Sequence, residues 1–374
     1  MSVSAIEQGS EFSIGPEDLW ADVLNYPFPE VRTLLNSLRL PQEFFMHLTP
    51  DEVARMLQDN KFDFDPVIQF ETKKGYVDRD RMHVPVLDRI HDLHHKDQLP
   101  GLSTYKHRYA TQGSTQAIRV LMPEWKAKGE MAELAVIGEN GREIGDEYMG
   151  YQAVADSFNI PVHRVPTLAE AGKPVKGRVW FISNPSAIDG NWLNDEALQA
   201  FIAAGHEVVL DFAYGGLAID PHDLDVSAPN IRAVLTSPSK IFGVFWQRYM
   251  GVAYTREKVS SLEWDAVMFK EIPTLLATLM LYKTFKPNEI PRLYQQRQIE
   301  ACVAIAALLR KDVQDIQPSD TLLMATMAEP LPDEYSGHLQ FTLPSGVSRF
   351  RIPGILEKQE LHKLGRQLWY PRID

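Results

Sequence analysis

A lysine and an arginine stand eight positions apart in the middle of the chain, in the run Ser237-Pro-Ser-Lys240-Ile-Phe-Gly-Val-Phe-Trp-Gln-Arg248. A lysine attacks carbonyl groups when burial or neighbouring cations lower its pKa. An arginine stays charged and binds phosphate through parallel hydrogen bonds. The run therefore indicates a Schiff-base nucleophile beside a bound phosphate, with a lysine in an ordinary α/β turn as the alternative.

Two earlier loops contain residues suited to holding a phosphate and a planar ring. In Gln112-Gly113-Ser114-Thr115-Gln116, the glycine permits close backbone approach, and the next amides open a predicted helix whose positive end favours an anion. In Asp146-Glu147-Tyr148-Met149-Gly150-Tyr151, the first tyrosine could lie flat on a ring. Both patterns also occur in ordinary turns and cores, so neither is specific alone.

An acid and a tyrosine end the apolar run Val208-Val-Leu-Asp211-Phe-Ala-Tyr214. The carboxyl ends of strands form the ligand-binding edge of an open parallel sheet. A carboxylate there can keep a pyridine nitrogen protonated and able to accept electrons, and Tyr214 can donate to a phenolate oxygen. The alternative for Asp211 is a cap of the next turn.

The elements that must position these residues alternate between short apolar runs and helical patterns. Strand, turn and helix recur three times, and two further apolar runs follow, in residues 105–129, 132–158, 177–205, 206–217 and 231–240. This alternation predicts an α/β fold with a mostly parallel central sheet flanked by helices.

The rest of the chain predicts further helices and a second, smaller sheet. Residues 250–255 resemble an antiparallel strand, long helical patterns run from about 260 to 311, and 338–343 and 348–353 predict strands of a smaller α+β domain. Near the start, turn-and-acid signals predict helices at 14–26 and 48–60.

A further helix, predicted over residues 80–99, carries His91, His94 and His95. Their spacing could place two imidazoles on one metal ion. No other ligand cluster with metal-site spacing is visible, and the nearby carboxylates are explained as charge pairs on a solvated helix. We therefore expect no metal.

Composition argues against several classes of protein. The 374 residues include 50 acidic and 38 basic side chains, a formal net charge of −12 that disfavours a nucleic-acid partner. The single cysteine, Cys302, fits a reducing compartment. The first 30 residues do not resemble a signal peptide, and the apolar stretches at 272–282 and 301–309 are too short to span a bilayer. We expect a cytoplasmic protein without a membrane partner.

Taken in order, these motifs resemble the fold-type I pyridoxal phosphate enzymes, in particular the class I/II aminotransferase group. Alliinase-like and plant tryptophan-aminotransferase-like members share the Gly-Ser-Thr-Gln form of the phosphate turn. The resemblance covers residues 76–251, and its specificity lies in the ordered set of motifs. It implies a large cofactor-binding domain at 76–270. It also implies a small domain built from both termini, with an N-terminal arm at 1–75 and an interdomain helix and small domain at 271–374.

The resemblance also implies a role for each matched residue. Lys240 would form the Schiff base with pyridoxal 5′-phosphate and later move the substrate α-proton. Asp211 would pair with the pyridine nitrogen, Tyr214 with the ring oxygen, and Tyr148 would stack on the ring. The phosphate would be held by Gly113, Ser114, Thr115, Ser237 and Arg248.

Three further residues match less closely. Arg349 resembles the strand arginine that binds a substrate α-carboxylate, and Arg351, two residues on, points the same way and stays an alternative. Tyr76 occupies roughly the place of a tyrosine that family dimers lend to the neighbour's phosphate. Asn184 starts the Asn-Pro segment, where its role would be structural.

The Asn-Pro segment itself departs from the family pattern. It reads Asn184-Pro-Ser-Ala187-Ile188-Asp-Gly190, so alanine replaces the asparagine that normally contacts the ring oxygen. The ring oxygen would then have one donor fewer, with an altered Schiff-base pKa.

The resemblance implies a homodimeric enzyme with shared active sites that acts on an amino acid through an external aldimine and an α-carbanion. Aminotransfer is the first reading. The alternative is a lyase, cyclase or oxidase of specialised amino-acid biosynthesis, similar to capreomycidine synthase, since the fold does not choose among fates of the carbanion. A catalytically silent relative is disfavoured because Lys240, Asp211 and Arg248 are present, and a P-loop NTPase because G-x-x-x-x-G-K-[ST] is absent.

Overall fold

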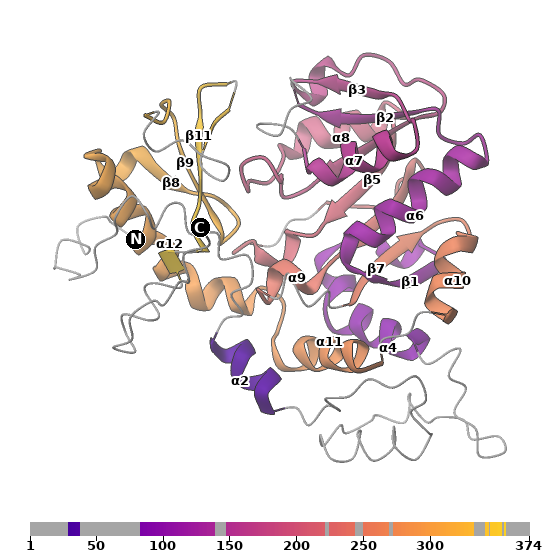
Figure 1. Ribbon diagram of the computed structural model, residues 1–374, viewed down its shortest axis with the longest axis horizontal. Coiled ribbons are helices and arrows are strands. Elements are labelled where there is room, and N and C mark those ends of the chain that lie inside the picture. The colour runs from indigo at the N-terminus through magenta and orange to yellow at the C-terminus, as the bar shows by residue number, and fades with distance from the viewer. Residues whose placement is uncertain are drawn as a thin grey trace, which may run out of the picture.

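The computed structural model describes residues 29–37, 83–138, 147–220, 224–243, 250–268, 272–332, 341–343, 345–353 and 355–356. Two sheets organise these residues (Figure 1). The larger has seven strands in the order β1-β7-β6-β5-β4-β2-β3, and the smaller has four in the order β10-β11-β9-β8. The predicted helices at 14–26 and 48–60 lie outside the described residues.

Six of the seven strands of the large sheet follow the predicted runs, and the short β3 lies between two predicted segments. Their bounds are β1 His107–Gln112, β2 Glu133–Ile137, β3 Val162–Val165, β4 Arg178–Ser183, β5 Glu207–Phe212, β6 Ile231–Thr236 and β7 Met250–Thr255. All neighbouring pairs are parallel except those that β7 makes with β1 and β6. The predicted mostly parallel α/β sheet is confirmed, as is the antiparallel strand at 250–255.

Helices cover both faces of this sheet, because its strands are apolar on both sides. Val209 and Phe181 pack under α6 (Gly113–Ala127), α7 (Met149–Ser157) and α10 (Ser260–Met268). Leu210 and Trp180 point into the opposite core, which contains residues of α4 (His83–Ile90), α8 (Asp195–Ala203), α11 (Ile272–Thr284) and α12 (Glu289–Leu309). Alternate residues of one strand thus fill two cores.

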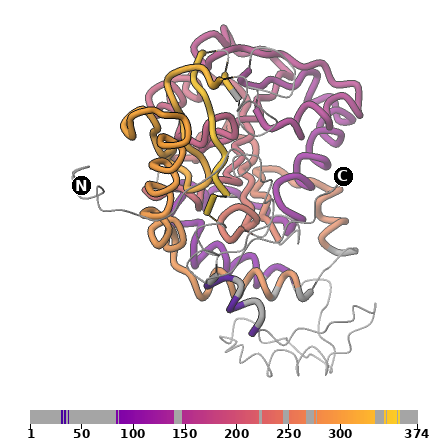
Figure 2. Tube along the Cα trace, turned by 60° about the vertical axis from the view of Figure 1, so that its left-hand side comes forward, coloured from indigo at the N-terminus to yellow at the C-terminus, as the bar shows by residue number. Residues whose placement is uncertain are grey.

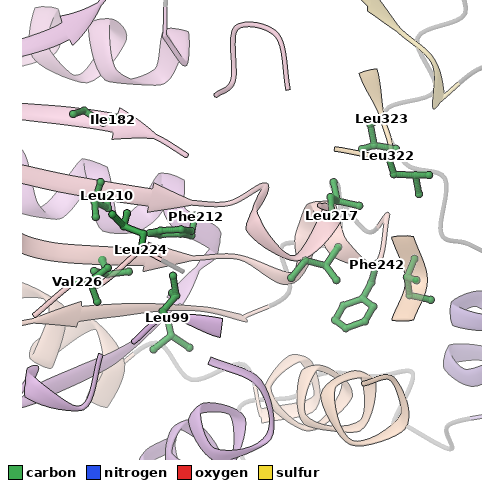
Figure 3. Close-up of a cluster of buried hydrophobic side chains, with 14 of the residues drawn as sticks. Leu99, Ile182, Leu210, Phe212, Leu217, Leu224, Val226, Phe242, Leu322 and Leu323 are labelled. Carbon is green, nitrogen blue, oxygen red and sulfur yellow. The ribbon is translucent and has the colours of Figure 1, made fainter. Parts of the chain in front are cut away.

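The smaller sheet is antiparallel and joins the second of these cores. Its strands are β8 Ile316–Pro318, β9 Met324–Met327, β10 Phe341–Thr342 and β11 Ser348–Arg351. Figure 3 shows part of the shared cluster, where Leu322 and Leu323 of the small sheet's first turn approach Leu217, which follows β5. One hydrophobic core therefore connects the two sheets.

Two further segments complete the described fold. Helix α2 (Pro29–Ser37) lies beside α11 in Figures 1 and 2, and Glu30 accepts a hydrogen bond from the Tyr294 hydroxyl. The predicted histidine helix forms as α4, a π-helical turn at His91–His95 and a short α5 at Lys96–Gln98. None of the described helices is long and apolar enough to span a bilayer.

Candidate active site

A cavity of about 290 Å³ opens at the carboxyl edge of the large sheet, where the loops after β1, β4, β5 and β6 meet. This is the edge at which open α/β sheets bind ligands. The cavity brings together eight residues singled out by the sequence: Gly113, Ser114, Thr115, Tyr148, Asp211, Tyr214, Ser237 and Lys240. Arg248 and Tyr76 lie outside the described residues.

Lys240 belongs to the short helix α9 (Pro238–Ile241), which directly follows β6. Ser237 caps this helix, and its hydroxyl oxygen accepts from the Ser239 amide at 3.2 Å. The Lys240 ammonium lies 5.4 Å from the centre of the Tyr214 ring. Burial lowers the pKa of Lys240; Tyr214 opposes this shift, and the positive charges of Arg351 and Arg349 add to it. The neutral, nucleophilic form of Lys240 therefore becomes more accessible.

Tyr214 follows β5 by two residues and shares this environment. Burial alone would raise the pKa of its hydroxyl, but the charges of Lys240, Arg351 and Arg349 outweigh burial and lower it. The phenol is thereby made a better proton donor toward anything bound beside Lys240.

Asp211 lies on the penultimate position of β5 and is 3% exposed. One carboxylate oxygen accepts from the Tyr151 hydroxyl at 3.0 Å, and the other from the Ala213 amide at 3.0 Å. Burial raises its pKa to about 6, while hydrogen bonds from Tyr151, Ala213 and Ser114 and the charge of Lys240 limit the rise. At pH 7 it is a buried carboxylate in the cavity wall.

The turn after β1 places Gly113 at the first position of α6 with a φ of +68°. A Cβ here would lie 3.4 Å from the Ser237 hydroxyl oxygen and 3.8 Å from that of Ser239. The missing side chain thus leaves a space lined by hydroxyls at the positive end of a helix, which suits an anion. Thr115 also faces this cavity and is hydrogen-bonded to the Tyr148 hydroxyl at 3.1 Å.

The predicted ring-stacking residue, Tyr148, directly precedes α7 and is 39% exposed. Its ring lies against the backbone of Gly150, where a Cβ would come within 2.2 Å of a ring carbon. Glycine at this position therefore leaves room for the ring beside the cavity.

Asn184 is fully buried and does not belong to the lining residues described for this cavity. Its side-chain oxygen accepts from the Leu193 backbone amide at 2.9 Å, and its backbone amide donates to the Asp211 carbonyl at 3.1 Å. Ala187, by contrast, does line the cavity. Arg349 donates to the Ala187 carbonyl at 3.4 Å, so β11 of the small sheet reaches the same loop.

Three residues that the sequence analysis did not assign also form this site. Tyr151 donates to Asp211, Ser183 lines the cavity at the end of β4, and the buried Glu147 binds Ser183 through two hydrogen bonds. The only sequence signal was the helical spacing that places Tyr151 one turn after Tyr148.

The three histidines of the predicted metal alternative are core residues. His94 is hydrogen-bonded to the Phe285 carbonyl at 2.6 Å and His95 to the Tyr254 hydroxyl at 2.7 Å. Burial lowers the pKa of all three imidazoles. Within the described ranges, no group of three or more His, Cys, Asp or Glu side chains could hold a metal ion.

Neither the known protein-family models nor the curated protein sequences contain a match to this chain. Solved structures do match it. An aspartate aminotransferase tetra mutant from Thermus thermophilus superposes with a TM-score of 0.54 at 14% identity, covering 75% of this chain and 84% of that one. The PLP-bound C-S lyase from Staphylococcus hominis gives 0.53 at 11%, with coverages of 97% and 90%.

L-Threonine-O-3-phosphate decarboxylase from Porphyromonas gingivalis gives a TM-score of 0.52 at 14% identity, covering 86% of this chain and 99% of that one. The neighbours thus include an aminotransferase, a lyase and a decarboxylase on one architecture. The chain has the fold of the fold-type I pyridoxal phosphate enzymes, as the motif order predicted.

Proposed function

We propose that this chain is a pyridoxal phosphate-dependent enzyme that acts on the α-carbon of an amino acid, with aminotransfer as the leading reaction. The observation that carries the proposal is the convergence of Lys240, Asp211 and the Gly113 turn on one cavity. Nucleophile, buried acid and anion-binding turn are the donor set that this cofactor requires. The fold of the neighbours agrees with this set.

When bound, pyridoxal phosphate would supply an aldehyde that condenses with amines and a protonated ring that takes up electrons. Lys240 would hold the aldehyde carbon and, once a substrate amine has replaced it, would carry the proton of the substrate α-carbon. Asp211 would keep the ring nitrogen protonated, and Tyr214 would donate to the ring oxygen.

The remaining roles follow the chemistry of each side chain. Ser114, Thr115 and Ser237, with the amides that follow Gly113, would bind the phosphate, and Tyr148 would cover the ring. Arg349 would bind the substrate carboxylate, and Arg248 the phosphate. A homodimer with shared sites, to which Tyr76 would contribute, and the three-part division at residues 75 and 270 remain proposals of the same kind.

The reaction type is decided by the step after removal of the α-proton. Elimination, cyclisation and oxidation start from the same step as aminotransfer, and the fold serves more than one of them. Ala187 replaces the asparagine of the family pattern, and this departure is why a lyase, cyclase or oxidase is the second candidate. Incubation with a panel of amino acids, with and without a keto acid, followed by mass spectrometry would separate these outcomes.

The central test is the bond to Lys240. Borohydride reduction of the loaded protein should attach the cofactor covalently to the peptide that contains Lys240, as seen by mass spectrometry. Lys240→Ala should lose this label and at least 10³-fold of turnover, on the scale of losing a catalytic nucleophile. Lys258→Ala, which removes an exposed lysine of the ion pair with Glu263, is the control and should retain both. A label on another lysine, or no label in the wild type, would overturn the proposal.

A further inference from the structure

The carboxyl group of Glu147 is buried in the wall behind the cavity and has no role in the function proposed above. The residue precedes Tyr148, is 3% exposed, and its amide donates to the Ile137 carbonyl at the end of β2. An acid held out of water must be neutralised or hydrogen-bonded. The hydrogen-bond partners of the Glu147 carboxyl group therefore indicate its role.

Both carboxyl oxygens of Glu147 contact the same residue, Ser183. One accepts from the Ser183 amide at 3.1 Å, and the other is hydrogen-bonded to the Ser183 hydroxyl. That hydroxyl oxygen also accepts from the Ala187 amide at 2.7 Å, and Ser183 lines the cavity. Glu147 and Ala187 thus meet at one hydroxyl group.

The charge around Glu147 favours its protonated form. Among the described residues, no lysine, arginine or histidine forms an ion pair with it. The ionisable groups that face it are Asp211 on β5 and the phenol of Tyr151 on α7. Burial raises the pKa of Glu147 to about 8; the hydrogen bonds from Ser183 and from the Tyr148 amide limit this rise, and the negative charge of Asp211 contributes to it.

The protonation state decides where the Ser183 proton points. A hydroxyl group has one proton and can accept two hydrogen bonds. If Glu147 is ionised, it accepts the Ser183 proton. If Glu147 is protonated, its own proton goes to the Ser183 oxygen, which then accepts from Glu147 and from the Ala187 amide. The Ser183 proton is left to donate elsewhere, and Ser183 faces the cavity.

We propose that neutral Glu147 donates to the Ser183 hydroxyl and thereby turns the Ser183 proton into the cavity, where it donates to the bound molecule. Ser183 is then a binding residue and Glu147 the residue that positions it. The proposal rests on the proposed function for the identity of that molecule. Ser183 would then supply a hydrogen-bond donor at the end of β4, just before the loop in which alanine occupies position 187.

The first test uses pyridoxal phosphate and three variants. Ser183→Ala should weaken binding of the cofactor about tenfold, the value of one charge-assisted hydrogen bond. Ser186→Ala, a change of the same type in the same loop but outside the lining residues described for the cavity, should bind within twofold of wild type. Glu147→Gln, whose amide donates permanently, should bind as tightly as wild type at pH 7.

The pH profile of cofactor affinity shows whether Glu147 orients the Ser183 proton or only supports the fold around it. Wild-type affinity should fall about tenfold relative to Glu147→Gln as the pH rises from 7 to 9.5, because ionised Glu147 takes the Ser183 proton back. Equal profiles for wild type and Glu147→Gln, or unchanged binding in Ser183→Ala, would overturn the inference.

A measurement on the cofactor-free protein keeps this test separate from the proposed function. The melting temperature of Glu147→Gln relative to wild type should rise by about 3 °C from pH 6 to pH 8 and stay level above pH 8.5. If the difference in melting temperature does not change with pH, the inference is overturned and the proposed function still stands. Failure of the wild type to bind pyridoxal phosphate overturns the proposed function, while a rising difference would still support a protonated Glu147.

Should Glu147→Gln fail to fold, the pH dependence of the stability of Ser183→Ala provides a second test. Loss of the hydroxyl removes a hydrogen bond that lowers the pKa of Glu147. The stability of Ser183→Ala should therefore continue to fall above pH 8, where the wild-type profile levels off, and a profile that levels off at the wild-type pH would count against the inference.

Discussion

Two buried acids, Asp211 and Glu147, lie on either side of the Ser183 backbone and differ in how they are solvated by the protein. Ser183 pairs with Asp211 in the register of β4 and β5. Asp211 receives hydrogen bonds from Tyr151, the Ala213 amide and Ser114, and lies near the charge of Lys240. Glu147 is bonded to Ser183 and to the Tyr148 amide. Their pKa values of about 6 and about 8 therefore place one ionised and one neutral acid in the wall at pH 7.

The raised pKa of Asp211 predicts that its contribution to stability depends on pH. This pKa is about 6 in the folded protein against 3.8 ordinarily, so between these values the folded chain retains a proton that the unfolded chain has lost. The contribution of Asp211 to stability falls as the pH rises through this window and is constant above it. The unfolding free energy of Asp211→Asn relative to wild type should thus rise by about 2 kcal/mol from pH 4 to pH 6.5 and then stay nearly level.

Urea denaturation of the cofactor-free protein at a series of pH values measures this difference. Asp156→Asn, on the exposed face of α7, is the control and should follow the wild type. If the Asp211→Asn difference did not change between pH 4 and pH 6.5, the raised pKa of Asp211 would be refuted.

Some of these residues could be predicted from the sequence and some could not. Lys240, Asp211, Tyr214 and the Gly113 turn each stand at the end of an apolar run, and parallel strands bring such ends to one edge. The roles of Glu147 and Ser183 depend on the register between β4 and β5 and on the loop before α7. Glu147 lies in an acidic stretch, where nothing in the sequence marks it as buried.

At the scale of elements, the antiparallel strand β7 determines the shape of the anion-binding turn. Gly251 on β7 pairs with Thr111 of β1 and lies beneath the start of α6. A Cβ at Gly251 would come within 2.5 Å of the Thr236 carbonyl oxygen and 2.9 Å of the Gly113 Cα. These neighbours are backbone atoms, so they cannot turn away as a side chain could.

Gly251→Ala should therefore displace the Gly113 turn and weaken binding of pyridoxal phosphate by at least tenfold. Gly172→Ala is the control, because nothing lies within 4 Å of its Cβ position and its φ of +71° carries only backbone strain far from the cavity. Equilibrium dialysis measures both affinities, and melting temperatures show whether each variant is folded. Wild-type affinity in Gly251→Ala would contradict this account of the turn.

The sequence predicts the large elements well because a long apolar periodicity remains recognisable even where single residues depart from it. The strand–turn–helix units and the helix at His83–Gln98 lie where the pattern placed them. The pattern missed β3, β8 and β9, whose three or four residues are too few to show alternation. It also missed the π-helical turn at His91–His95, since one wide turn leaves the spacing of the histidines unchanged.

At the scale of the whole molecule, the loop after β4 joins the two sheets. The Asn191 side chain accepts from the Asp320 amide at 3.1 Å, and the Asp320 carboxylate accepts from the Trp192 amide at 2.9 Å. Gly190, with a φ of +80°, would clash with Thr321 if it carried a side chain. The loop that carries Ala187 to the cavity is therefore tied to the turn between β8 and β9.

The same contact brings a cation from the small sheet to the cavity. Arg349 and Arg351 lie on one face of β11, since the alternating residues Ser348 and Phe350 are fully buried. Arg349 donates to the Ala187 carbonyl, and burial lowers its pKa to about 10, so it keeps its charge at pH 7. The small sheet thus places a cation beside the loop that lines the cavity, and under the proposed function the substrate carboxylate would bind there.

Substitution of Arg349 by lysine separates the two halves of this site, because it keeps the charge and removes the planar fork that binds a carboxylate bidentately. We expect Arg349→Lys to weaken binding of an amino acid by at least tenfold and to leave the affinity for pyridoxal phosphate within twofold. Arg351→Lys, the same change two residues along the strand, is the matched control and should alter neither. Spectroscopic titration of the loaded protein measures both affinities.

If Arg351→Lys lost amino-acid binding while Arg349→Lys kept it, Arg351 would be the residue that binds the substrate carboxylate. If both variants lost the cofactor, the small sheet would support the cofactor cavity and not the substrate.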